Sequence, residues 1–181
     1  FHIIKFYLSN INSKLNKYMQ RDAAVLLYGN AVAGILISFI ASSFLVFAFS
    51  NPLTESFKQM WWWGMSFLLA IRFADMLWWK IKLQKIEFNG KESIKRFIVG
   101  TNSTAIMWSI YLVYLTTHSN DIELTTAIIT ISAMSGGSAT VLAGHKYTAM
   151  FYAFVLLSPG SIGLLLSEEY ALRLLGVLGL S

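Results

Sequence analysis

The residues that decide the fold run from Ala23 to Thr54 and contain no Asp, Glu, Lys or Arg. The centre of this stretch reads Ala31-Val-Ala-Gly-Ile-Leu-Ile-Ser-Phe-Ile-Ala-Ser-Ser-Phe-Leu-Val-Phe-Ala-Phe49. About 20 consecutive apolar residues allow a helix to cross the hydrocarbon core of a bilayer. A helix also satisfies its own backbone hydrogen bonds, which lipid cannot do. We therefore predict a transmembrane helix at residues 24–49 and an integral membrane protein.

The rest of the chain has the same apolar character. Of its 181 residues, 56% are hydrophobic and only 13% are charged, whereas soluble domains carry about 25% charged residues. The charges cluster between apolar runs, which predicts a polytopic membrane protein. The lack of cysteine excludes disulfides, thiolate metal ligands and cysteine nucleophiles. Because the chain begins at Phe1 and ends inside an apolar run, we expect it to be a piece of a longer polypeptide.

Five more apolar segments follow the first, separated by short polar connections. We predict an all-α helical bundle of about six transmembrane helices, at 24–49, 59–79, 94–117, 124–144, 147–167 and, incomplete, 170–181. Residues 1–22 alternate apolar and basic positions at helical spacing, which predicts an amphipathic helix on the cytoplasmic membrane surface. An ordinary helix packed on loops or on a missing domain is the alternative for this segment. The chain then divides into the segment 1–22 and a transmembrane domain at 23–181.

Basic residues concentrate on alternate connections. Segment 1–22 holds four Lys or Arg, the 80–96 linker holds six and the 145–146 loop holds one, whereas the other loops hold only Lys58. The positive-inside rule then places the N-terminus and the 80–96 linker in the cytoplasm. Juxtamembrane basic residues face anionic lipid. The net charge of +5 therefore indicates the lipid bilayer, and not nucleic acid, as the partner.

Two charged residues, Arg72 and Asp75, lie inside the second predicted helix. They are three positions apart and so share one face, where they can pair. Charged groups within a transmembrane segment are costly and often mark a functional interior. We predict that they pair and face a small polar pocket between the second and third helices. The predicted ligand-binding residues are Arg72, Asp75, Asn102, Ser103 and Trp108, with Thr104 beside them. Snorkelling of Arg72, or a purely structural role in helix packing, is the alternative.

The fourth predicted helix carries a stripe of small residues. Ser132, Gly136, Thr140 and Gly144 recur at every fourth position. Such a pattern lets helices approach closely in lipid and predicts a helix-packing seam. Room for a ligand is the alternative.

The fifth predicted helix contains Pro159 and Gly160, which predict a kink. Proline frees the carbonyl of the preceding turn. A neighbouring Ser or Thr could satisfy that carbonyl, or it could take a signal or an ion.

No pattern in these 181 residues predicts catalysis. There is no glycine-rich phosphate loop, no Ser/His/Asp arrangement and no pair of catalytic carboxylates. His2, His118 and His145 fall at different depths, so we predict no metal site and no cofactor. Asp121 and Glu123 are interpreted as solvated loop charges. Whether a longer polypeptide carries a catalytic domain outside these residues is left open.

Several stretches together carry a resemblance to a known family. They are Arg21 with Leu26-Leu27-Tyr28-Gly29-Asn30, Trp63 with Arg72, Met107-Trp108, Gly136-Gly137-Ser138-Ala139-Thr140, and Phe151 to Pro159. Over residues 21–175 the chain resembles the multi-pass N-terminal sensor region of bacterial signalling proteins. In that family the region precedes a histidine-kinase core or a diguanylate cyclase (GGDEF) domain, sometimes with a phosphodiesterase (EAL) domain. The chain departs from the family at residues 160–163, where a further proline is usual.

The resemblance implies a sensor of the bacterial inner (cytoplasmic) membrane that works as a homodimer and passes its signal to an output domain outside this chain. The short outer loops favour a lipophilic small molecule, or a membrane property, over a large soluble ligand. Two other classes stay open: a small transporter or channel subunit, and a membrane scaffold that oligomerises through the stripe of the fourth helix.

Overall fold

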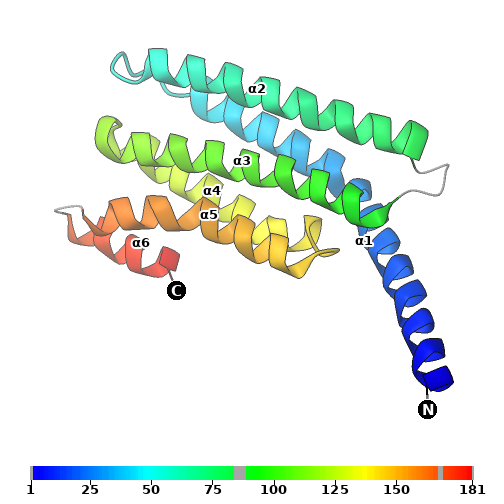
Figure 1. Cartoon of the computed structure of the whole chain (residues 1–181). Helices are drawn as coiled ribbons and strands as arrows, with labels where there is room; N and C mark the ends of the chain where they lie inside the picture. Colours follow the sequence, from blue (N-terminus) through cyan, green and yellow to red (C-terminus); the bar gives the residue numbers. More distant parts are fainter. Residues whose placement is uncertain (1, 84–88, 167–168, 181) are drawn as a thin grey trace.

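The computed structural model describes residues 2–83, 89–166 and 169–180, and all regular structure in these ranges is helical (Figure 1). The elements are α1 (His2–Phe47), α2 (Glu55–Trp78), the π-helix η1 (Trp79–Leu83), α3 (Gly90–His118), α4 (Asp121–Val141), α5 (Lys146–Leu165) and α6 (Tyr170–Leu180). The predicted all-α class is confirmed. The ends predicted at residues 167 and 181 lie outside the described residues.

Four helices of the described chain are long and apolar enough to cross a membrane. They are Tyr18–Phe47 within α1, together with α3, α4 and α5. α2 has 24 residues but carries Lys58, Arg72 and Asp75, which make it more polar. α6 has only 11 residues, fewer than the about 20 that a span needs. Length and composition therefore support four of the six predicted spans, and they fit a membrane-embedded protein.

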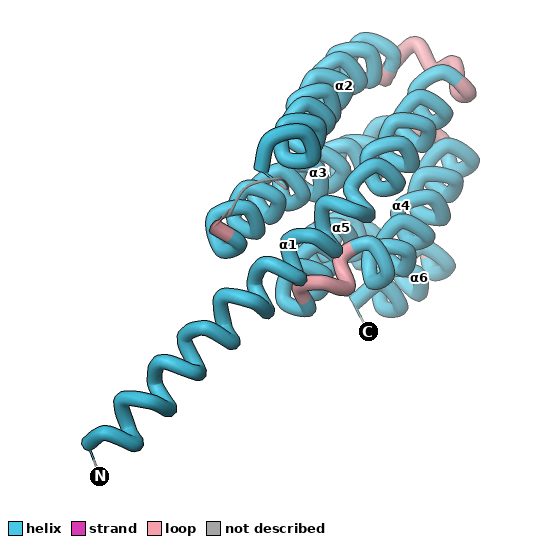
Figure 2. Tube along the Cα trace, turned by 90° about the vertical axis from the view of Figure 1, so that its right-hand side faces the viewer, coloured by secondary structure: helices cyan, strands magenta, loops and turns pink. Residues whose placement is uncertain are grey.

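The predicted segment 1–22 and the first predicted span form one continuous helix. α1 has 46 residues, and its N-terminal part extends away from the bundle in both views (Figures 1 and 2). The helix joins the bundle where buried residues begin to recur every three or four positions, the spacing of one helix face. These residues are Ala24, Leu27, Tyr28, Ala31 and Ile35. The apolar face predicted for 1–22 falls largely on side chains outside the described part.

α3 is the central helix and packs against α1, α2, α4 and α5. Its first residue, Gly90, lies so close to the backbone of Gln20 and Arg21 that a Cβ atom would collide with it. α6 folds back along α5 (Figure 1), where Gly176 lies against the backbone at Ser161. Close approach through small residues is how helices pack in lipid.

α5 continues through Pro159 as one helix. Proline frees the carbonyl four residues earlier, here that of Val155. The Ser109 hydroxyl of α3 donates a hydrogen bond to this carbonyl. Gly160 lets the Leu112 side chain of α3 approach the backbone of α5. The interpretation in which a neighbouring hydroxyl satisfies the carbonyl is confirmed, and the predicted kink residues belong to the α3–α5 interface.

The small-residue stripe of α4 is only partly used within the chain. Ser132, Gly136 and Thr140 are exposed, and Gly144, which follows the end of α4 at Val141, lies against the Ala23 carbonyl of α1. The buried face of α4 is instead formed by Leu124, Ala127, Ile131, Ser135 and Ser138. The predicted seam is therefore not a continuous contact: Ser132 and Thr140 line pockets between the helices, and Gly136 has open space around it.

Candidate functional site

Arg72 continues the buried face of α2. The buried residues of this helix recur at intervals close to one turn and are Lys58, Trp61, Met65, Leu69 and Met76. Arg72 lies between the last two on the same face, so helix geometry directs its side chain into the bundle. A guanidinium inside a membrane helix is costly unless neighbouring groups bind it.

Two threonines of α3 bind this guanidinium. Arg72 Nη1 donates to Thr104 Oγ1 at 2.8 Å, and Nη2 donates to Thr101 Oγ1 at 3.0 Å. Both threonines are buried. They accept two of the five N–H groups that a guanidinium offers. Within the described ranges no carboxylate lies at salt-bridge distance from Arg72, so neutral hydroxyls alone connect this cation to α3.

Asp75 has different partners. Its carboxylate forms an ion pair with Arg96 of α3 and accepts a hydrogen bond from the Tyr28 hydroxyl of α1 at 2.8 Å. The predicted Arg72–Asp75 pair is therefore wrong. Both side chains leave one face of α2, but Arg72 reaches α3 at Thr101 and Thr104, and Asp75 reaches it nearer its N-terminus, at Arg96.

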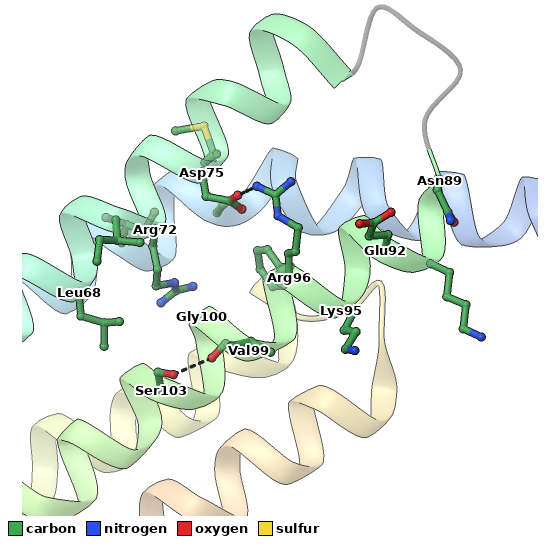
Figure 3. A pocket seen from close by; sticks show the side chains of 16 residues that line it. Leu68, Arg72, Asp75, Asn89, Glu92, Lys95, Arg96, Val99, Gly100 and Ser103 are labelled. Carbon is green, nitrogen blue, oxygen red and sulfur yellow. Dashed lines mark hydrogen bonds and ion pairs between the residues drawn. The ribbon is translucent and has the colours of Figure 1, made fainter.

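Arg72 and Asp75 both line a pocket of about 740 Å³ between α1, α2 and α3 (Figure 3). Glu92, Lys95 and Arg96 lie near the start of α3, whereas Arg72 points toward Gly100, further along that helix. The apolar wall consists of Ala31, Ile35, Leu68, Ile71, Met76, Phe97 and Val99. The basic lining residues are Arg72, Lys91, Lys95 and Arg96, against the acidic Asp75 and Glu92. A largely apolar pocket with a few charged groups is typical of a ligand site.

The structure brings three of the five predicted site residues together. Ser103 lines the pocket with Arg72 and Asp75. Asn102 does not line it, and its buried Oδ1 has no hydrogen-bond partner in the described chain. Trp108 is fully buried, with its ring 5.1 Å from that of Trp61, and belongs to the core.

Two groups of this site are not predicted from the sequence. Thr101 lies one turn from Thr104, on the face of α3 that faces Arg72, and both hydroxyls accept hydrogen bonds from it. Arg96 falls in both the charged linker and the predicted helix 94–117, but its contact with α2 is not predicted; in the structure it faces α2 and pairs with Asp75. The spacing of Thr101 and Thr104, one helical turn apart, is the signal that could have identified Thr101.

A second buried charge lies at the other end of α2. Lys58 Nζ is 2.8 Å from Glu123 Oε1 of α4, and the two side chains are only 1% and 0% exposed. Lys58 Nζ also donates to the Phe49 carbonyl at 2.7 Å. The Asn51 amide reaches Glu123 Oε2 at 3.5 Å. The two side chains pair with each other and are almost fully buried, so this site is closed to solvent.

The predictions that Lys58 lies in a loop and that Glu123 is a solvated loop charge are therefore wrong. α2 begins at Glu55 and α4 begins at Asp121, each a few residues earlier than predicted. Both charged residues consequently lie in the first turns of helices and face the bundle. Asp121 is exposed, as expected.

The chain matches no protein-family model, no curated protein and no solved structure to which it was compared. In the part of the chain that the structure describes, no three His, Asp or Glu side chains lie close enough to hold a metal ion. The function proposed next therefore depends on the chain's own residues and their geometry.

Proposed function

We propose that the chain is the membrane-embedded input region of a bacterial signal-transduction protein. It passes a ligand or a membrane-state signal to a cytoplasmic output domain, a histidine kinase or a diguanylate cyclase. The resemblance over residues 21–175 suggests this class. The observation that carries the proposal is Arg72, a cation inside the helix bundle that only two hydroxyls connect to α3 and that borders an amphiphilic pocket.

The contacts of Arg72 give such a protein a physical basis for responding to a signal. A carboxylate or phosphate binds a guanidinium through two parallel hydrogen bonds and carries the opposite charge, whereas each threonine offers one neutral acceptor, so an anionic group competes well with Thr101 and Thr104. A ligand that binds one α2–α3 packing better than another shifts the population between them. Contacts continue from α3 to α5 through Ser109 and the Val155 carbonyl. They continue from α5 to α6 at Gly176, which provides a contiguous path toward the C-terminal end.

The proposal includes six passes, a cytoplasmic N-terminus, the bacterial inner membrane and a homodimer. Basic residues gather at the start of α3, where Lys91, Lys95 and Arg96 line the pocket, and this supports the cytoplasmic side for that end. α2 directs Lys58 and Arg72 into the bundle, so its charges do not forbid a membrane position. The exposed stripe on α4 supports contact between two copies.

The test follows the position of α6 relative to α3 in the full chain. The chain has no cysteine, so Val113→Cys and Leu174→Cys, both at exposed positions, can carry two spin labels in nanodiscs. We expect the distance distribution from pulsed electron paramagnetic resonance to shift when phosphatidylglycerol is added to a phosphatidylcholine bilayer. The same shift should be lost in Arg72→Gln. A fixed distance in both bilayers, together with ion or solute flux in reconstituted vesicles, would overturn the proposal in favour of a transporter or channel.

A further inference from the structure

A second pocket shares Arg72 with the first but lies among α1, α4 and α5. It has a volume of about 500 Å³, and Arg72 and Thr101 form its wall toward α2 and α3. The remaining wall includes Gly34 and Ala41 of α1, Ala133 and Gly137 of α4, and Tyr152 of α5. Ligand pockets in proteins typically measure about 300–1,000 Å³, so this one has room for a small amphiphilic molecule.

The walls of this second pocket favour an apolar occupant that enters from lipid. Small residues leave the space open, since a Cβ atom at Gly137 would meet no other atom within 4 Å. Ile37 and Ile129 line the pocket and are exposed on the outside of the bundle. In a membrane-embedded protein such exposed apolar side chains face acyl chains, so the mouth of the pocket opens toward the bilayer.

The charge of the second pocket is concentrated in Arg72. Thr101 and Thr104 accept two of its five N–H groups, and the other three have no acceptor among the residues described. Carboxylates and phosphates bind a guanidinium through two parallel hydrogen bonds. The buried Tyr152 lines the same pocket, and its hydroxyl is a further donor. An acyl chain without a head group would leave these donors unsatisfied.

We propose that this pocket binds a lipophilic acid, with its apolar body between α1 and α4 and its carboxylate or phosphate at Arg72. The inference rests on the proposed function only in taking the bound acid as the signal. A free fatty acid and an anionic phospholipid share the required chemistry.

The first arm of the experiment tests whether the charge of Arg72 matters. The full chain in phosphatidylcholine nanodiscs is labelled with a photoreactive oleate, and mass spectrometry maps the labelled peptides. We expect labels on α1 and α4, an apparent affinity about tenfold weaker in Arg72→Gln, and similarly weak labelling by the photoreactive oleyl alcohol. Equal labelling of the two proteins by oleate, or equal labelling by acid and alcohol, would overturn the site.

The second arm uses two adjacent glycines as matched controls. Gly136 and Gly137 are both exposed and both have open space where a Cβ atom would lie, but only Gly137 lines the pocket. Leucine favours a helix over glycine, so both substitutions preserve the fold, which circular dichroism verifies. We expect Gly137→Leu to block labelling and Gly136→Leu to leave it unchanged. Equal labelling in the two variants would mean that the probe reports general lipid contact, and the site would be abandoned.

Competition separates the two sources of the acid. Displacement of the probe by phosphatidylglycerol supports an anionic phospholipid as the occupant, and displacement by unlabelled oleate alone supports a free fatty acid. The distance between the labels on α3 and α6, measured with phosphatidylglycerol and with oleate, keeps the two proposals apart. Oleate labelling that depends on Arg72, with a fixed distance, supports this site and overturns the signalling role. A distance that shifts without such labelling overturns this site alone.

Discussion

Two cations, Lys58 and Arg72, lie on the buried face of α2 and differ in what surrounds them. Lys58 is 2.8 Å from the carboxylate of Glu123 and also donates to the Phe49 carbonyl, in a site with almost no exposure. Arg72 donates to two threonine hydroxyls and borders two pockets. A buried cation that is paired with a buried carboxylate is a closed structural element, whereas a cation that has no carboxylate partner and borders two pockets stays available to a ligand.

The two sites should therefore differ in what they contribute to stability. Replacing a whole buried ion pair by apolar groups is often neutral, but removing one partner leaves an uncompensated charge and is strongly destabilising. The Lys58–Glu123 pair fixes the end of α2 against α4. No carboxylate pairs with Arg72 in the described chain, so its removal leaves no buried countercharge behind.

The largest expected effect is that of Glu123→Gln, which leaves the Lys58 ammonium buried without an anion. We expect the free energy of unfolding to fall by about 3–5 kcal/mol. The measurement is a titration with sodium dodecyl sulfate in mixed micelles, in which circular dichroism monitors unfolding. Asp121→Asn is the matched control, because Asp121 is exposed on the same turn of α4. Equal losses in the two variants would show that the pair is not a closed structural element.

The second prediction concerns the double variant Lys58→Met, Glu123→Gln, which removes both charges. We expect it to be more stable than Glu123→Gln alone, because no charge is then left unpaired. The coupling free energy from the double-mutant cycle should reach about 3 kcal/mol, the upper end of the usual range for residues in contact. Additive effects of the two substitutions would contradict a direct pair.

The helices follow from the sequence more directly than their first residues do. Long apolar runs predicted the helices because about 20 apolar residues have few other stable structures in lipid. Helix starts were harder to predict. The Asn120 side chain accepts a hydrogen bond from the Glu123 backbone N–H at 2.9 Å, which begins α4 earlier than its apolar run does. Because α4 begins at Asp121, Glu123 lies in its first turn and is buried in the bundle, and not in a solvated loop as the sequence predicts.

The candidate site shows the limit of local patterns. The positions of Arg72 in the second predicted helix and of Ser103 in the third are clear from the sequence. The i, i+3 spacing of Arg72 and Asp75 correctly indicated one face, but it contained no information on neighbouring helices. In the structure Asp75 pairs with Arg96 of α3, and Arg72 donates to Thr101 of α3. The packing of α2 against α3 determines these contacts. The outward orientation of Gly136 depends on packing in the same way.

The third prediction concerns the partly exposed Asp75–Arg96 pair, whose side chains are 23% and 37% exposed. We expect Arg96→Gln to lower the free energy of unfolding by about 0.2–1 kcal/mol, the usual range for exposed pairs. Asp75 keeps its hydrogen bond from the Tyr28 hydroxyl, which limits the loss. The same detergent titration measures it, with Lys95→Gln as an exposed control on the next position of α3. A loss as large as that of Glu123→Gln would mean that this pair, too, behaves as a closed element.

The smallest expected change in stability is that of Arg72→Gln. The substitution removes hydrogen bonds to Thr101 and Thr104, each with a net contribution of about 1.5–3 kcal/mol because the donor is charged, but it also removes an intramembrane cation whose placement costs about 2.5–3.5 kcal/mol. Glutamine can still donate to a threonine hydroxyl, so we expect the two contributions nearly to cancel in the detergent titration. The same variant should lose the Arg72-dependent labelling by photoreactive oleate. A fall in stability comparable to that of Glu123→Gln would make Arg72 a structural residue like Lys58, and the distinction between a closed and an available charge would no longer hold.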